Sequence, residues 1–212
     1  MIKIEDIDVY GWEPAIRGMR NPMNSWDKSD TIFDGDKWCL GENDLKLMQQ
    51  LSAAGNDHAK FLRMINVTMD ITAPLYWWSE FDTYKVGTVR NSCSKMHKIH
   101  IKEFSHNDFS HESIYSIDYA KMVFVKYCSM CERLRKDFNK IGDVKYWKAL
   151  IEALPEGYNM CATVQLNYQV LKSMYWARRN HKLDEWKYFC VQVEFLPYFA
   201  DICMEPVSYK HV

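Results

Sequence analysis

The segment from Thr163 to Arg179, TVQLNYQVLKSMYWARR, constrains this chain more than any other part of it. It contains neither Gly nor Pro, and it therefore predicts a helix. Four residues are spaced by four, three and four positions and so share one helical face: Asn167, Leu171, Met174 and Arg178. At ~1.5 Å per residue, Asn167 and Arg178 are about 16 Å apart along the axis. One ligand with two polar ends could contact both, although Asn and Arg at the solvent edge of an amphipathic helix would share this spacing.

Length and composition predict one domain over residues 1–212, because no run rich in Gly, Ser or Pro suggests a linker. Hydrophobic residues make up 48% and charged residues 26%, a balance typical of globular proteins. No apolar run approaches the ~18 residues of a membrane helix, so we expect no membrane partner. The opening residues, MIKIEDIDVYGWEP, lack the pattern of a secretory signal. Seven scattered cysteines then favour the reducing cytoplasm.

Charge, cysteine spacing and histidine spacing each fit an ordinary structural role. A net charge of −1 makes a nucleic-acid partner unlikely, because phosphate neutralisation needs a basic face. Cys128 and Cys131 have metal-like spacing, yet they lie in an apolar helix without a second pair, which favours structural cysteines. Four histidines cluster in one segment: His97, His100, His106 and His111. Their irregular spacing argues against a metal site, so we predict no bound metal.

The hydrophobic pattern predicts an α+β fold. Alternation indicates strands near Ile2–Ile7 and over 66–71, which we expect to share a sheet. His58 leads a short helical turn into the second of these strands. Residues 91–116 read as a long loop. Three-four periodicity predicts further helices over 42–55, 75–84, 117–139, 143–154 and 183–196. In the first of these, three residues are expected to face inward: Leu45, Met48 and Leu51.

A scattered set of positions resembles one known family. These positions are Leu154, Pro155, Asn167, Leu171, Arg178, His181 and Trp186. Their order and spacing are similar to the C-terminal helix of the flavin-dependent thymidylate synthases, the ThyX family. Upstream, Asp57-His58 stands where the family has Glu-His, and Ala73-Pro74 follows as an Ala-Pro pair does in the family. The resemblance covers roughly residues 40–195.

The family's signature segment is altered in this chain. That signature is Arg-His-Arg, two residues, Ser, one residue, Asn-Glu, one residue, Ser, one residue, Arg. In one register its positions are taken by Thr83, Tyr84, Lys85, Thr88, Arg90, Asn91, Cys93 and Lys95. A one-residue slip instead aligns its second half with Asn91, Ser92, Ser94 and Met96. The sequence leaves both registers open.

Two further guanidinium groups of the family are missing. Gln169 replaces the Arg of an Asn-x-Arg pattern, and Ile151 stands where the family has a phosphate-contacting Arg. Neither side chain reproduces the planar fork of donors that Arg offers to phosphate. Four positively charged residues remain in this region: Lys85, Arg90, Lys95 and Lys98. They could bind anionic groups from new positions. Alternatively, they are ordinary solvated charges of a loop.

The resemblance implies an α+β domain of the ThyX type, with helices packed on a small, mainly antiparallel sheet. It also implies a homotetramer with active sites where subunits meet. The implied reaction is reductive methylation of deoxyuridine monophosphate (dUMP), or of a related pyrimidine deoxynucleotide. Methylenetetrahydrofolate would donate the carbon, FAD would deliver the hydride, and NADPH would act as a further co-substrate.

Residue roles are carried over in the same way. Arg178 would be the catalytic residue, holding the pyrimidine and stabilising negative charge on its ring. The implied cofactor contacts are His58, Thr83, Lys85, Thr88 and Asn167. The implied nucleotide contacts are Glu80, Ser94 and Arg178. We further expect subunit contacts through residues 75–84, because their aromatic side chains suggest apolar surface on more than one face.

A second function is compatible with the same residues. The altered signature favours a catalytically silent protein that keeps the fold to bind a nucleotide or a protein partner. The preserved spacing from Asn167 to Arg178 favours an occupied site and an enzyme.

Overall fold

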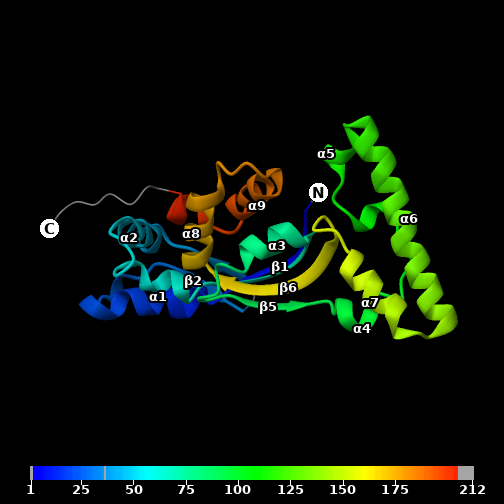
Figure 1. Ribbon diagram of the computed structural model, residues 1–212. Helices are drawn as coiled ribbons and strands as arrows, with labels where there is room; N and C mark the ends of the chain where they lie inside the picture. The colour runs from blue at the N-terminus through cyan, green and yellow to red at the C-terminus, as the bar shows by residue number, and fades with distance from the viewer. Residues whose placement is uncertain (1, 36, 205–212) are drawn as a thin grey trace. The chain divides into compact units, whose positions relative to one another are not determined.

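The structure is a computed structural model that describes residues 2–35 and 37–204. It has an α+β fold with a small antiparallel sheet, which confirms the predicted class (Figure 1). The four-stranded sheet has the order β1-β4-β6-β5, with bounds Lys3–Tyr10, Asn66–Pro74, Asn159–Asn167 and Val89–Ser92. A separate antiparallel hairpin joins β2 (Ile32–Asp34) and β3 (Lys37–Cys39).

Helices occupy most of the remaining described chain. The α-helices are α1 (Trp12–Arg20), α2 (Glu42–Ala53), α3 (Leu75–Phe81), α4 (Lys95–Lys98), α5 (Glu112–Tyr115), α6 (Asp118–Ile141), α7 (Val144–Ala153), α8 (Tyr168–Arg178), α9 (Asp184–Glu194) and α10 (Phe199–Cys203). Short 3-10 turns are η1 (Asn21–Met23), η2 (Trp26–Lys28), η3 (Ala59–Arg63) and η4 (His106–Asp108). Helix α1, the hairpin and α10 were not expected from the sequence.

The chain divides into two compact units. Among the described residues, the first unit contains 2–3, 70–83 and 90–163. The second contains 4–35, 37–69, 84–89 and 164–204. The single domain over 1–212 stays a prediction.

Strand β4 shows the predicted alternation. Val67, Met69 and Ile71 are buried, whereas the residues that alternate with them, Asn66, Thr68 and Asp70, are half-buried. Strand β6 repeats the pattern with four buried residues: Met160, Ala162, Val164 and Leu166. Because side chains alternate between the faces of a strand, each of these strands has one apolar face for the core.

The predicted helix over Thr163–Arg179 is wrong in its first part. The strand β6 continues to Asn167, and α8 begins at Tyr168. The alternation that ends with Val164 and Leu166 decides this, because it suits a strand and not a helix. Asn167 is the N-cap of α8, so it does not share a helical face with Arg178 as expected.

The segment 91–116 is more ordered than the predicted loop. It contains the end of β5, then α4, η4 and α5. Ser94 caps α4, and Ser105 and Asp108 form a capping box around η4. These polar residues gave the segment its loop-like composition, but they serve as helix caps.

Helix α2 and the cysteines of α6 sit close to expectation. Met48 is buried and Leu45 and Leu51 are half-buried. Cys128 and Cys131 are buried free thiols in two small apolar clusters of the first unit. Burial raises the pKa of Cys131 to about 11, in agreement with the structural interpretation of the pair.

The aromatic residues of α3 do not leave the exposed surface that was expected. Trp77, Trp78 and Phe81 are 0%, 2% and 1% exposed. They pack edge-on or tilted against one another, and Trp78 Nε1 donates to the carbonyl oxygen of Met160 at 2.9 Å. The reason given for subunit contacts through this helix is therefore wrong, and the tetramer stays a prediction.

A bidentate ion pair within helix α6 holds the chain before η4 through further hydrogen bonds of its two members. Arg135 donates through Nε and Nη2 to the two carboxylate oxygens of Glu132, at 2.8 and 2.7 Å. The N–H of Phe104 donates to the same carboxylate at 3.0 Å, and Arg135 Nη1 donates to the carbonyl of His100 at 3.2 Å. These bonds, led by those of Arg135, lower the pKa of Glu132 to about 2.

We expect Glu132→Gln to destabilise the protein in a pH-dependent way. Because the folded pKa is lower than the ordinary 4.5, ionised Glu132 stabilises the fold above pH 4.5. This contribution, on the order of 2 kcal/mol, is lost as the pH falls from 4.5 towards 2. Urea unfolding across that range should show the gap between wild type and variant closing. The control is Glu152→Gln, since Glu152 is 66% exposed and lies 3.7 Å from Lys148. An equal loss in both variants would contradict a special role for Glu132.

Candidate functional site

Helix α8 is fixed at its first residue by the strand that precedes it. The side-chain oxygen of Asn167 accepts a hydrogen bond from the N–H of Val170 at 3.1 Å. Tyr168 is fully buried, and its hydroxyl donates to the carbonyl of Pro197 at 2.7 Å. Leu171 and Met174 are also fully buried one turn apart. The end of α8 is therefore placed by a rigid core.

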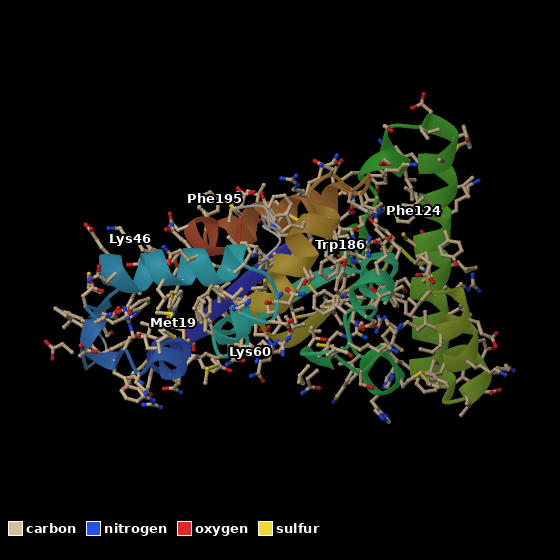
Figure 2. The ribbon with its side chains drawn as sticks, turned by 90° about the vertical axis from the view of Figure 1, so that its left-hand side faces the viewer. Met19, Lys46, Lys60, Phe124, Trp186 and Phe195 are labelled. Carbon is tan, nitrogen blue, oxygen red and sulfur yellow. The ribbon has the colours of Figure 1, made fainter. Side chains whose placement is uncertain are left out.

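Arg178, in the last turn of α8, lies against two aromatic rings of the second unit. Its Nε donates to the hydroxyl of Tyr84 at 2.9 Å. Its guanidinium carbon is 5.6 Å from the centre of the Tyr84 ring and 4.9 Å from that of Trp186. Trp186, labelled in Figure 2, lies on α9. It is fully buried. Cation–π attraction and the hydrogen bond together fix the plane of the guanidinium.

The loop 84–88 follows α8 from its cap to its last turn. Gly87 has φ +82°, and a Cβ there would lie 3.0 Å from Val170 Cγ2 and 3.3 Å from Asn167 Nδ2. At the other side of the loop, Tyr84 contacts Arg178. The hydroxyl of Thr88 donates to the carbonyl of Tyr84 at 2.5 Å and closes the turn.

The second unit thus brings together four of the predicted site residues, Lys85, Thr88, Asn167 and Arg178. Lys85 is exposed on the loop that lies along α8. His58 is exposed at the N-cap of η3. Two residues before it, the side chain of Asn56 accepts a hydrogen bond from Gln169 Nε2 at 3.2 Å, which ties this turn to the start of α8.

The other predicted residues belong to the first unit. Glu80 lies in α3, and its carbonyl accepts from the hydroxyl of Thr83 at 2.7 Å. Ser94 lies after β5, and its hydroxyl accepts from the N–H of His97 at 3.3 Å as a helix cap. The structure does not test the ligand contacts predicted for these three residues.

Arg90 is not an ordinary solvated charge of this segment. Its Nη2 is 3.0 Å from a carboxylate oxygen of Asp82, and its guanidinium lies 4.7 Å from the centre of the Trp78 ring. Only 24% of its side chain is exposed. Its Nη1 is buried with no hydrogen-bond partner among the described residues.

Sequence reasoning missed Gly87 and gave Tyr84 no role of its own. Gly87 lies between two signature positions, Lys85 and Thr88. A glycine there could have indicated that the backbone comes close to another element. Tyr84 occupied a signature position without matching it, so its contact with Arg178 could not be read from the sequence.

The described residues contain neither a metal-binding cluster nor a membrane-spanning helix. Within ranges 2–35 and 37–204, no group of three or more His, Cys, Asp or Glu side chains could hold a metal ion. In the same part of the chain, no helix has the length and apolarity needed to cross a membrane.

Comparison with known proteins identifies the fold. No protein-family model and no curated protein matches the chain. Solved structures of flavin-dependent thymidylate synthases do match it along nearly its whole length, and the chain has a ThyX-like fold, as its sequence predicted.

Three of the similar structures are informative. Thymidylate synthase X (ThyX) from Helicobacter pylori, solved with FAD and dUMP, is 16% identical, with 97% of this chain and 98% of that chain covered and a TM-score of 0.69. A second structure of ThyX from this organism, also with FAD and dUMP, is 16% identical, with coverages of 95% and 98% and a TM-score of 0.67. The UMP/dUMP methylase PolB from Streptomyces cacaoi, bound with 5-Br dUMP, is 14% identical, with coverages of 92% and 88% and a TM-score of 0.61.

The residues of this chain do not fit a tight grip on FAD. The single hydroxyl protons of Thr83 and Thr88 are donated to backbone carbonyls, and Gln169 donates to Asn56. Asn167 uses its side-chain oxygen as a helix cap. Lys85 is the only Lys or Arg among the predicted cofactor contacts. One ammonium group does not replace several guanidinium groups at a diphosphate.

We expect Gly87→Ala to destabilise the protein by about 2 to 3 kcal/mol, because the new Cβ meets Val170 and the left-handed backbone disfavours Ala. Gly142→Ala is the control, since Gly142 has φ +75° with nothing within 4 Å of its Cβ position. It should lose only about 1 kcal/mol. Denaturant unfolding measures both. Equal losses would show that loop 84–88 does not press against α8.

Proposed function

We propose that the protein is a ThyX-like enzyme that methylates dUMP or a related pyrimidine deoxynucleotide reductively. The fold supports this proposal, as do the nucleotides bound in the similar structures. The observation that carries it is the fixed guanidinium of Arg178 between Tyr84 and Trp186. A random surface arginine would not combine a hydrogen bond with two aromatic contacts at a half-buried position.

Arg178 would act electrostatically. Arginine stays charged at any working pH, and its donors match the carbonyl oxygens of a pyrimidine. When hydride adds to C6 of the ring, the electron pair moves onto C5 and the C4 carbonyl oxygen, where negative charge develops. A guanidinium already held in place by Tyr84 would stabilise this charge without reorganisation. Tyr84 is then a positioning residue, because it acts through Arg178.

The remaining roles are proposed in the same sense. Methylenetetrahydrofolate would supply the carbon, FAD the hydride chemistry and NADPH the reducing equivalents. Lys85 would hold an anionic group as a point charge from its exposed place beside α8. His58, Thr83, Thr88 and Asn167 would line the flavin, and Glu80 and Ser94 the nucleotide. The enzyme would work as a homotetramer in the cytoplasm.

The alternative function is a catalytically silent nucleotide-binding protein. The hydrogen bond from Gln169 to Asn56 favours it, because the residue at the family's arginine position is engaged within the protein. The used hydroxyl groups of Thr83 and Thr88 favour it as well. In this case the Arg178 site would still bind the nucleotide.

Both functions predict that saturating dUMP raises the melting temperature. At about 100 times the dissociation constant the expected rise is roughly 5 to 10 °C. Arg178→Ala should abolish the rise. Arg179→Ala is the matched control, because the neighbouring Arg179 lies 4.1 Å from the Trp176 ring and should leave the response intact. If Arg178→Ala responds to dUMP like wild type, Arg178 has a structural role and the nucleotide site is misplaced.

Flavin binding separates the two functions. Each lost guanidinium contact should weaken FAD binding at least tenfold, because charge-assisted hydrogen bonds contribute ~1.5 to 3 kcal/mol. The protein should therefore purify largely colourless. If it is an enzyme, added FAD should accelerate tritium release from C5 of dUMP in the presence of methylenetetrahydrofolate and NADPH. Gln169→Arg should bind FAD more tightly.

The absorbance and fluorescence of FAD report this binding in a titration. If neither wild type nor Gln169→Arg binds FAD while both are folded and respond to dUMP, the flavoenzyme proposal fails and the silent nucleotide-binding protein stands.

A further inference from the structure

Cys93, just after β5, is hydrogen-bonded to Cys161 on the neighbouring strand β6. The N–H of Cys93, one residue past the end of β5, donates to the carbonyl of Cys161 on β6 at 3.0 Å. Strands β5 and β6 are adjacent in the sheet (Figure 1). Residues that pair across antiparallel strands through two such bonds have Cα atoms about 5.5 Å apart, and Cys93 and Cys161 make one of these two bonds at the end of the ladder. A disulfide needs a Cα separation of about 4.4 to 6.8 Å.

Both thiols lie on the open face of the sheet. On β6, Met160 and Ala162 are buried, so Cys161 between them points to the opposite side, as does exposed Thr163. On β5, Arg90 points towards Trp78 of α3. Cys93, an odd number of residues further on, continues the face turned away from Trp78.

The other cysteines are poorer candidates for oxidation. Burial raises the pKa of four thiols, which keeps them protonated and shielded: Cys128, Cys131, Cys190 and Cys203. Cys39 is exposed, but it lies in the hairpin of the other unit. Cys93 is exposed and Cys161 is half-buried, so an oxidant can reach the first and the second is placed to resolve it.

We propose that Cys93 and Cys161 form a reversible disulfide in response to hydrogen peroxide. The Cys93 thiolate attacks the peroxide, the O–O bond breaks, and Cys93 becomes a sulfenic acid as one water leaves. The Cys161 thiol then attacks that sulfur, the S–O bond breaks, and a second water leaves with the S–S bond formed. Two thiols lose two electrons and two protons, and one hydrogen peroxide is reduced to two waters. A dithiol reductant reverses the reaction.

The proposed disulfide would close the base of the helical part of the first unit. Between Cys93 and Cys161 the chain builds α4, η4, α5, α6 and α7. A crosslink across so long a loop restricts the unfolded chain strongly, and it should stabilise the oxidised protein. This inference is independent of the proposed function, because it uses no residue assigned to nucleotide or flavin.

Peptide mapping of the full chain tests the proposal. The reduced protein is treated with hydrogen peroxide, free thiols are blocked with N-ethylmaleimide, and the digest is analysed by mass spectrometry without reductant. A peptide linking Cys93 to Cys161 within one chain is expected, and it should disappear after dithiothreitol. The oxidised protein should melt roughly 5 °C or more above the reduced one.

Single Cys→Ser variants show whether the thermal shift depends on these two cysteines. Cys93→Ser and Cys161→Ser should each abolish the linked peptide and the rise in melting temperature. Cys39→Ser is the matched control and should retain both. The proposal is overturned if peroxide leaves Cys93 as a sulfinic acid with Cys161 free, if Cys93 links two chains, or if Cys93→Ser keeps the full thermal shift.

Discussion

The direct passage from β6 into α8 is the constraint on which the candidate site depends. Asn167 ends the strand and caps the helix with one side chain, so no flexible connection separates the two elements. The buried face of the strand fixes the start of the helix, and the core beneath Leu171 fixes its direction. The sheet therefore determines the position of Arg178 at the far end of the helix. Loop 84–88 contacts the same helix at both ends. Gly87 lies close to its start, and Tyr84 is hydrogen-bonded to Arg178 in its last turn.

The sequence predicted elements best where one period ran without interruption. The alternation of β4 and the three-four rhythm of α6 and α9 were clear, and these elements formed where expected. The segment after Thr163 failed because a Gly-free and Pro-free run hides a change of period at Asn167. Segment 91–116 failed because serines that cap short helices look like loop residues. Local composition does not distinguish these cases, since the outcome depends on tertiary contacts.

The positions of some candidate-site residues could be predicted from the sequence for a physical reason. Arg178 and Asn167 could be found because their spacing along the chain is kept by a helix and its cap. The partner of Arg178 could not be found, because Tyr84 reaches it from far away in the sequence. Engagement of hydroxyl groups is also invisible in a sequence. Thr83 and Thr88 resemble ligand-binding residues until their protons are seen to bond to backbone carbonyls.

The backbone bond between Cys93 and Cys161 brings the two ends of a long helical segment together. A segment whose two ends lie side by side can be treated as an insertion between the two strands. Its length can change at a small entropic cost, because loop closure depends only weakly on the number of residues enclosed. The paired strands β5 and β6 would need no new geometry to accept a shorter turn or a foreign domain in its place. Protein engineers thus have a natural point for grafting a reporter or a second binding module onto this fold.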